Sequence, residues 1–206
     1  MSDAQEYVKI IEWSEEDQRS VATAIRSSIC LRAAERLYVI VDACQASELV
    51  DVARSQFKQP VRMLFKGAAA SCEEIESVAP FLIPVDLETE FLEHWSALWG
   101  RNAGILLVSP AEPRVIFRHL RKIFVVQDEQ GQEYFFRFYD PRVLRVYLPT
   151  CTPEELTEFF GPVERFVLEG DDPNTLLSLA FELGKLKTST RLLTGEGARP
   201  RVRSRT

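Results

Sequence analysis

The chain has 206 residues, 46% of them hydrophobic and 27% charged, a composition typical of a globular protein that excludes a largely disordered chain. No apolar run approaches the roughly 20 residues that span a bilayer, and the acidic N-terminus lacks the basic and apolar regions of a signal peptide. We therefore expect a cytoplasmic protein without membrane insertion. The cysteines are scattered without a C-x-x-C pair, so neither a zinc site nor a redox motif is indicated.

The net charge of −6 is unevenly distributed, because residues 185–206 are rich in Lys and Arg and the remainder is strongly acidic. Nucleic-acid binding rests on clustered cations that neutralise phosphates, so an acidic body is a poor platform for it. Glycine, proline and few apolar residues follow Leu193. This composition predicts that residues 188–206 form a basic, disordered tail.

Helical and strand patterns alternate over most of the chain. Apolar positions at helical spacing behind Ser14 predict a capped amphipathic helix within residues 14–36. Short apolar runs predict buried strands over residues 37–41, 61–65, 81–85 and 103–108. Helical spacing predicts helices in the segments between them, including residues 88–99 with Trp95 and Trp99 on one buried face, and over 114–124.

Residues 134–139 are aromatic except for Arg137 and predict an inner strand, paired as an antiparallel hairpin with residues 125–127. Asp140 and Pro141 should end this strand and cap a helix over residues 141–148. We interpret the motif residues as structural, with largely buried rings and a capped corner: Phe136, Phe138, Tyr139, Asp140 and Pro141.

Further helices are predicted over residues 153–160 and 172–183. The fold class is therefore α/β (mixed α+β), with a mixed sheet flanked by helices and a smaller, mainly helical C-terminal lobe. The predicted division is an N-terminal helical extension, an α/β lobe, a helical lobe and the basic tail, over residues 1–36, 37–145, 146–187 and 188–206.

The search for catalytic chemistry yields one weak arrangement. Asp42, Asp86 and Asp140 each follow a predicted strand and could together hold magnesium for hydrolysis or phosphotransfer, although carboxylates at strand ends also cap helices. His94 and His119 lie in no metal-binding motif, and the P-loop, the nucleophile elbow and the dinucleotide fingerprint are absent. We expect no cofactor, no metal and no catalytic residue.

Two basic sets are candidates for partner binding. Arg118, Arg121 and Lys122, together with Arg114, occupy neighbouring turns of one predicted helix and either dock an acidic protein surface or form a solvated face. Arg137 and Arg142 flank the capped corner, where they either orient it or contact a partner.

The order of several short motifs over about residues 37–165 resembles the type VI secretion effector chaperone, or adaptor, family, which was long described only as a domain of unknown function. The longest matching element is Phe136-Arg137-Phe138-Tyr139-Asp140-Pro141-Arg142. The other matching elements are Leu37-Tyr38-Val39-Ile40-Val41-Asp42-Ala43, Leu64-Phe65-Lys66-Gly67, Ala79-Pro80-Phe81-Leu82, Trp99-Gly100 with Gly104-Ile105-Leu106-Leu107, His119-Leu120-Arg121-Lys122, Leu148-Pro149 and Phe159-Phe160-Gly161-Pro162.

The resemblance implies a bacterial cytoplasmic protein that binds a toxic effector, stabilises it and promotes its loading onto the VgrG spike or a PAAR-type tip. It implies no catalytic residues. Two alternatives stay open: a metal-dependent enzyme using the strand-end carboxylates, and an immunity protein that neutralises a toxin. The effector, its contact surface and the stoichiometry do not follow from the sequence.

Overall fold

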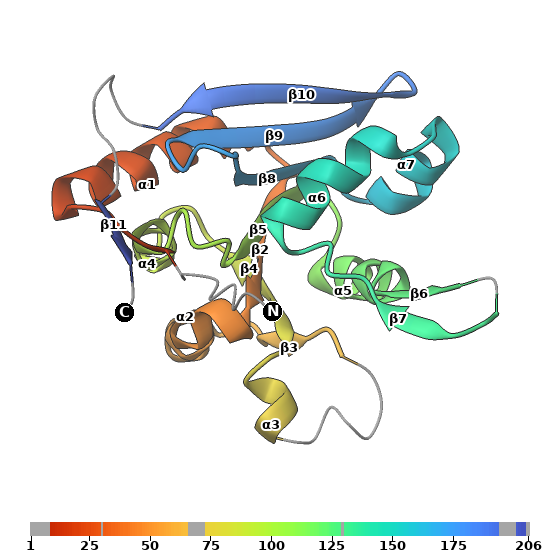
Figure 1. Cartoon of the computed structure of the whole chain (residues 1–206), viewed down its shortest axis with the longest axis horizontal. Helices are drawn as coiled ribbons and strands as arrows, with labels where there is room; N and C mark the ends of the chain where they lie inside the picture. The colour runs from red at the N-terminus through yellow and green to blue at the C-terminus, as the bar shows by residue number, and fades with distance from the viewer. Residues whose placement is uncertain (1–8, 30, 66–72, 129, 194–200, 205–206) are drawn as a thin grey trace, which may run out of the picture.

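A computed structural model describes residues 9–29, 31–65, 73–128, 130–193 and 201–204. A seven-stranded sheet crosses the molecule with the strand order β10-β9-β8-β5-β2-β4-β3 (Figure 1). Its strands are β2 (Arg36–Asp42), β3 (Arg62–Met63), β4 (Pro80–Val85), β5 (Gly104–Ser109), β8 (Arg165–Glu169), β9 (Thr175–Glu182) and β10 (Lys185–Leu192).

Every neighbouring pair in this sheet is antiparallel. The predicted mixed α+β class is confirmed, whereas the expected mixture of parallel and antiparallel strands was wrong. An alternation of strands and helices does not fix which strands become neighbours: β2 lies between β4 and β5 and pairs antiparallel with both.

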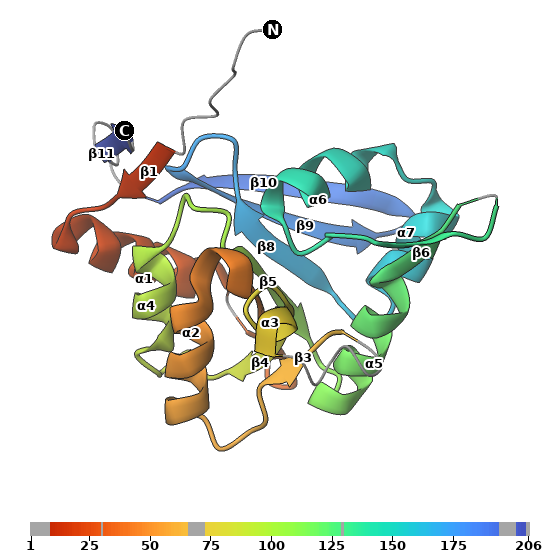
Figure 2. The same ribbon diagram turned by 60° about the horizontal axis from the view of Figure 1, so that its bottom comes forward.

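Helices cover both faces of the sheet (Figures 1 and 2). One face carries α1 (Glu15–Ile29), α2 (Ala43–Gln56) and α4 (Phe91–Ala97), and the other carries α5 (Pro113–Ile123), α6 (Pro141–Tyr147) and α7 (Pro153–Phe160). A short α3 (Glu73–Glu76) lies beside β3, and the 3-10 turn η2 (Leu148–Thr150) follows α6. No helix in these described ranges is long and apolar enough to cross a membrane.

Two hydrophobic cores result, and β2 belongs to both because successive side chains of a strand point to opposite faces. Val39 and Val41 pack under α1, α2 and α4, whereas Tyr38 and Ile40 pack under α5, α6 and α7. Both predicted indoles are buried in the first core, with Trp95 2% and Trp99 1% exposed. The continuous apolar run of β2 is therefore the signature of a strand covered on both faces.

The C-terminal part departs from the sequence prediction. Residues 172–183 are not a helix: β9 and β10 form a hairpin closed by Leu183 and Gly184, both at positive φ. Leu176 and Leu179 suggested helical spacing, but the sheet buries them on opposite faces of β9. Residues 165–192 thus extend the main sheet, and the helices within the predicted helical lobe of residues 146–187 are the end of α6, η2 and α7.

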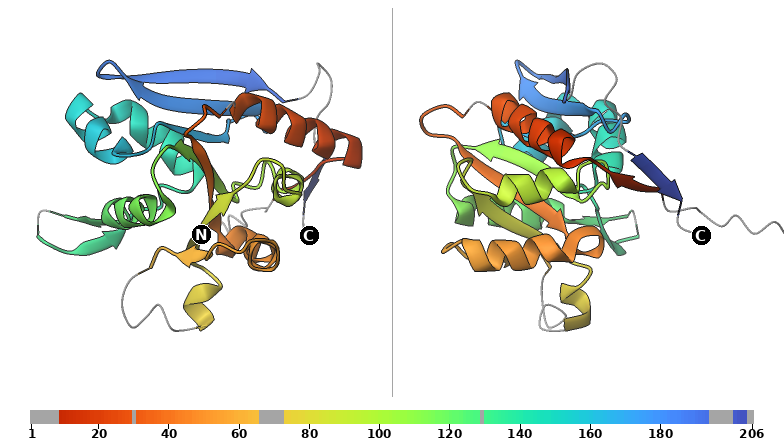
Figure 3. Two further views of the ribbon diagram at one scale, coloured as in Figure 1. Left: turned by 180° about the vertical axis from the view of Figure 1, so that it is seen from behind. Right: turned by 90° about the vertical axis from the view of Figure 1, so that its left-hand side faces the viewer.

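The predicted disordered tail is wrong where the structure describes it. β10 includes residues 188–192, and β11 (Arg201–Ser204) pairs antiparallel with β1 (Lys9–Glu12) (Figure 3). Residues 194–200 and 205–206 lie outside the described part. α1, predicted as part of an N-terminal extension, packs into the first core through Val21, Ile25 and Ile29.

Candidate functional site

Helix α5 forms the floor of a surface groove of about 1100 Å³. Pro113 occupies the first turn of this helix, where its missing N–H costs no hydrogen bond. Ile116 and Leu120 anchor the helix in the second core, so its arginines lie on the outer side. The lining residues are Arg62, Arg114, Val115, Phe117, Arg118, His119, Arg121, Lys122, Phe124, Val125, Gln127, Glu133, Phe135 and Pro162; we call this surface the basic groove.

Aromatic rings interleave with the cations of the basic groove. The guanidinium groups of Arg62 and Arg121 lie 5.4 Å and 5.3 Å from the centroid of the Phe117 ring, within cation–π range. Phe135 stacks on Phe124 with 5.2 Å between centroids, yet 60% of Phe135 remains exposed. The groove therefore offers apolar surface next to positively charged groups.

The charge of the basic groove is largely uncompensated. Arg62, Arg114, Arg118 and Arg121 form no ion pair within the described residues, and Glu133 is the acidic residue of the lining. Lys122 differs, because its Nζ lies 2.7 Å from Glu158 Oε1 on α7. A guanidinium fork binds carboxylates in a bidentate geometry, so this groove suits an acidic ligand that also carries apolar side chains.

Helix α5 is fixed against the end of α7 by His119. Its Nε2 lies 2.8 Å from the Phe159 carbonyl oxygen, and burial lowers the pKa of the imidazole. Gly161 has φ +49°, and a Cβ at this position would lie 2.5 Å from His119 Cε1. This close approach explains why position 161 is a glycine, and it indicates a structural role for His119.

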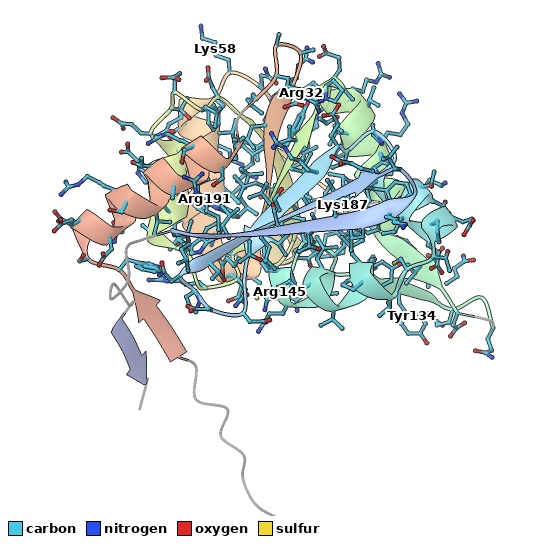
Figure 4. The ribbon with its side chains drawn as sticks, turned by 90° about the horizontal axis from the view of Figure 1, so that it is seen from above. Arg32, Lys58, Tyr134, Arg145, Lys187 and Arg191 are labelled. Carbon is cyan, nitrogen blue, oxygen red and sulfur yellow. The ribbon has the colours of Figure 1, made fainter. Side chains whose placement is uncertain are left out.

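The ribbon of β6 (Val125–Gln127) and β7 (Glu133–Phe135) forms one wall of the groove and projects from the body (Figure 1). The predicted antiparallel pairing is confirmed. The predicted inner strand over residues 134–139 was wrong, because β7 ends at Phe135 and Tyr134 is 53% exposed (Figure 4). The chain turns after Phe135 and buries Phe138 and Tyr139 in the second core, while Phe136 is half-buried against Tyr147.

The capped corner at Asp140 is built as predicted. Asp140 is the N-cap of α6, accepts a hydrogen bond from the Arg142 backbone N–H, and is followed by Pro141 in the first helical turn. The Arg142 side chain also donates to this carboxylate, from Nε to Oδ1 at 3.0 Å and from Nη2 to Oδ2 at 2.8 Å. Burial acts to raise the pKa of Asp140, but the hydrogen bonds and charge of Arg142 outweigh it and hold the pKa below its ordinary value.

Arg137 connects this corner to the end of β2. Its Nη2 lies 2.9 Å from Asp42 Oδ2 and 3.8 Å from Asp140 Oδ2. Asp42 caps α2 by accepting from the Cys44 backbone N–H, and burial raises the pKa of its carboxyl group in spite of Arg137. Arg137 and Arg142 therefore hold the corner in shape, and neither lines the basic groove.

Asp42, Asp86 and Asp140 do not share a site. Asp42 opposes Pro80 on β4, whereas Asp86 follows Val85, which opposes Leu37 at the far end of β2. Five residue steps along a strand separate these ends by roughly 17 Å. The described residues contain no group of His, Cys, Asp or Glu able to hold a metal ion. The geometry thus contradicts a common magnesium site for these three carboxylates.

The structure brings together Arg118, Arg121 and Lys122, which the sequence placed on one helix. Sequence reasoning missed Phe117 on the same helix, and it missed Arg62 on β3 and Phe135 on β7, which join the groove from two other elements. Nothing in the sequence links Arg62 to the others, because β3 contains only Arg62 and Met63 and lies 50 residues or more before α5. The exposed Phe135 was missed because an aromatic run more often marks a buried strand.

Comparison with family models gives a match over residues 37–158 to a family described as Domain of unknown function (DUF4123). The match covers more than half of the chain. The chain belongs to this family. No curated protein and no solved structure matches it.

The DUF4123 segment begins with β2 and reaches into α7. It includes the capped corner with Arg137, Asp140 and Arg142, and every arginine and aromatic ring of the basic groove. The strands β8, β9 and β10 lie beyond it but belong to the same sheet. The DUF4123 description itself assigns no activity to these features.

Proposed function

We propose that this chain is an adaptor that binds a type VI secretion effector, stabilises it and promotes its loading onto a VgrG or PAAR spike component. Membership in DUF4123 and the motif order that resembles effector adaptors support this proposal. The observation that carries it is the basic groove, whose lining combines the exposed ring of Phe135 with arginines that form no ion pair among the described residues.

In this proposal the effector contributes an acidic segment with apolar side chains. Carboxylates pair with Arg114, Arg118 and Arg121, and an apolar side chain covers Phe117 and Phe135. Aromatic and Arg residues dominate the binding energy of many protein interfaces, so a few such anchors suffice for a specific complex. Binding adds stability to an effector only if it favours the folded effector over its unfolded state.

The test is an affinity pull-down of the tagged protein from its native bacterium, with mass spectrometry of the bound proteins. The double variant Arg118→Glu/Arg121→Glu should lose the effector because both substitutions reverse charge in the groove. The matched control is Arg19→Glu/Lys58→Glu, which changes the net charge equally at exposed positions outside the groove. It should retain the effector.

Recovery of an effector or spike component with the unchanged protein and the control, but not with the groove variant, supports the proposal. Equal recovery with all three proteins contradicts the groove assignment. A captured toxin that the chain inactivates but does not deliver for secretion would favour the immunity role.

A further inference from the structure

Strand β10 forms one edge of the seven-stranded sheet, and among the described residues only β9 pairs with it. Figure 1 shows it at the outer margin, and Figure 4 shows Lys187 and Arg191 along its length. β10 is eight residues long and exposed along almost its whole length. An edge strand presents unpaired backbone groups, which another extended chain can use for pairing.

The register of the hairpin identifies which backbone groups are free. The two-residue turn at Leu183 and Gly184 makes Glu182 and Lys185 a hydrogen-bonded pair, so Lys187, Ser189 and Arg191 also direct their backbone groups toward β9. The alternate residues direct their N–H and C=O groups away from β9: Leu186, Thr188, Thr190 and Leu192. No hydrogen bond within the described ranges occupies these groups.

The side chains of this edge select the charge of a partner strand. Lys185, Lys187 and Arg191 share one face of β10 because they are separated by even numbers of residues. Neither lysine forms an ion pair within the described residues, and Arg191 Nη1 lies 3.1 Å from the Ser28 hydroxyl oxygen on α1. Opposite charges at facing positions stabilise a strand pair, so a strand with carboxylates on this face is favoured.

The same side chains oppose self-pairing. Two copies of β10 paired antiparallel around Thr188 would place Lys185 of each copy opposite Arg191 of the other. Facing like charges destabilise a strand pair, so a second copy of this chain is a poor occupant. This edge is thus protected against self-association while it remains open to an acidic strand.

We propose that the free edge of β10 docks an extended acidic segment of a partner protein by antiparallel or parallel strand addition. Main-chain hydrogen bonds to Leu186, Thr188, Thr190 and Leu192 supply the pairing, and carboxylates at alternate positions meet Lys185 and Lys187. Arg62 of the basic groove lies on β3, at the opposite edge of the sheet, roughly 29 Å away at six strand spacings. One chain therefore presents two separate docking surfaces, and the β10 surface does not depend on the proposed function.

The experiment uses the full chain and a fluorescein-labelled eight-residue peptide in which glutamate alternates with valine. A second peptide with glutamine in place of glutamate controls for charge. Thr188→Pro removes an N–H group that points away from β9, so the hairpin keeps its ladder while the added strand loses a donor. Thr188→Ala is the matched control, because it removes the side chain and keeps the N–H group. Binding is measured by fluorescence anisotropy, and folding by thermal unfolding.

We expect the glutamate peptide to bind the protein with an unchanged β10 and Thr188→Ala equally, and to bind Thr188→Pro about tenfold more weakly or worse. Amide exchange should slow at alternate residues of β10 when the peptide is bound. The variant Lys185→Glu/Lys187→Glu should lose the glutamate peptide, and it tests the proposal even if Thr188→Pro does not fold. Because the basic groove also suits an acidic peptide with apolar side chains, every protein in this experiment, including the one with an unchanged β10, carries Arg118→Glu/Arg121→Glu, so that binding reports on the β10 edge alone.

Failure of the glutamate peptide to bind the protein with an unchanged β10 overturns the proposal. Equal binding of the two peptides overturns the charge selection, and equal binding to the folded Thr188→Pro variant overturns strand addition.

Discussion

Arg137 joins the turn before α6 to the N-cap of α2 through Asp42, with 2.9 Å between Nη2 and Oδ2. Asp42 exposes 2% of its side chain, whereas Arg137 exposes 48%. We expect Arg137→Ala to lower the free energy of unfolding by about 1 to 3 kcal/mol at neutral pH, because it leaves a buried carboxylate without its charged partner. Urea unfolding measures this loss.

A double-mutant cycle tests the cause. Asp42→Asn keeps an acceptor for the Cys44 backbone N–H but carries no charge, so Arg137→Ala should cost little in that background. The cost should also shrink as the pH falls and Asp42 is protonated, since burial raises the pKa of this carboxyl group. An equal cost in both backgrounds would show that Arg137 acts through contacts other than Asp42, such as its ion pair with Asp140.

Phe138 and Phe136 should differ in their contribution to stability. Phe138 is 0% exposed within the second core, so Phe138→Ala should lower the free energy of unfolding by about 3 to 5 kcal/mol through the cavity it leaves. Phe136 is half-buried at the edge of the same core, and its truncation should cost clearly less. Chemical denaturation of both variants checks this order, and a larger loss at Phe136 would contradict it.

Glu169 should make stability depend on pH. Burial raises the pKa of this carboxyl group to about 7, against hydrogen bonds from the backbone of Asn102 and Gly100 and the charge of Arg145. Because the folded state holds its proton to a higher pH than the unfolded state, this residue lowers the free energy of unfolding as pH rises from about 4.5 to about 7. The free energy of unfolding falls by roughly 3 kcal/mol in total over this range, and Glu169 causes no further change at higher pH.

Glu169→Gln should remove this slope. The amide keeps an oxygen that can accept from the Asn102 backbone N–H. The difference in unfolding free energy between the variant and the unchanged protein should therefore grow from pH 4.5 to pH 7 in favour of the variant. Parallel slopes across this range would show that Glu169 titrates normally in the folded state.

Gly161→Ala should destabilise the junction between α5 and α7. A methyl group would clash with the His119 ring, and φ +49° disfavours a side chain. We expect a loss of about 1 to 3 kcal/mol in the free energy of unfolding. In a His119→Ala background the same change should cost less because only the backbone strain remains. Thermal unfolding of the four proteins measures this coupling, and strictly additive losses would contradict the contact.

The parts of the fold that local patterns determine were predictable from the sequence. The apolar run of β2 and the Asp140-Pro141 helix start follow from burial on both faces and from N-capping. The strand around Leu176 and Leu179 was not predictable from the sequence. A short apolar stretch with three-residue spacing fits both a helix and a strand that is buried on two faces. The positive-φ turn at Leu183 and Gly184 decides between them.

The candidate site was predictable only where its residues are close in sequence. Arg118, Arg121 and Lys122 follow from the periodicity of α5, whereas Arg62 reaches the groove through tertiary packing that no local pattern encodes. The sequence does not decide whether Arg137 contacts a partner or orients the corner, because its partner Asp42 lies 95 residues away in the chain.

The hydrogen bonding between β5 and β8 makes the folding unit larger than the family segment. β8 follows the end of the DUF4123 match, yet it covers Leu106, Leu107 and Val108 of β5, all of which are fully buried. A protein cut after residue 158 would open that edge of β5 and expose the apolar side of the second core to solvent. The strands outside the family segment thus cover this edge of β5, and a fragment lacking them should aggregate through the same strand pairing that normally completes the sheet.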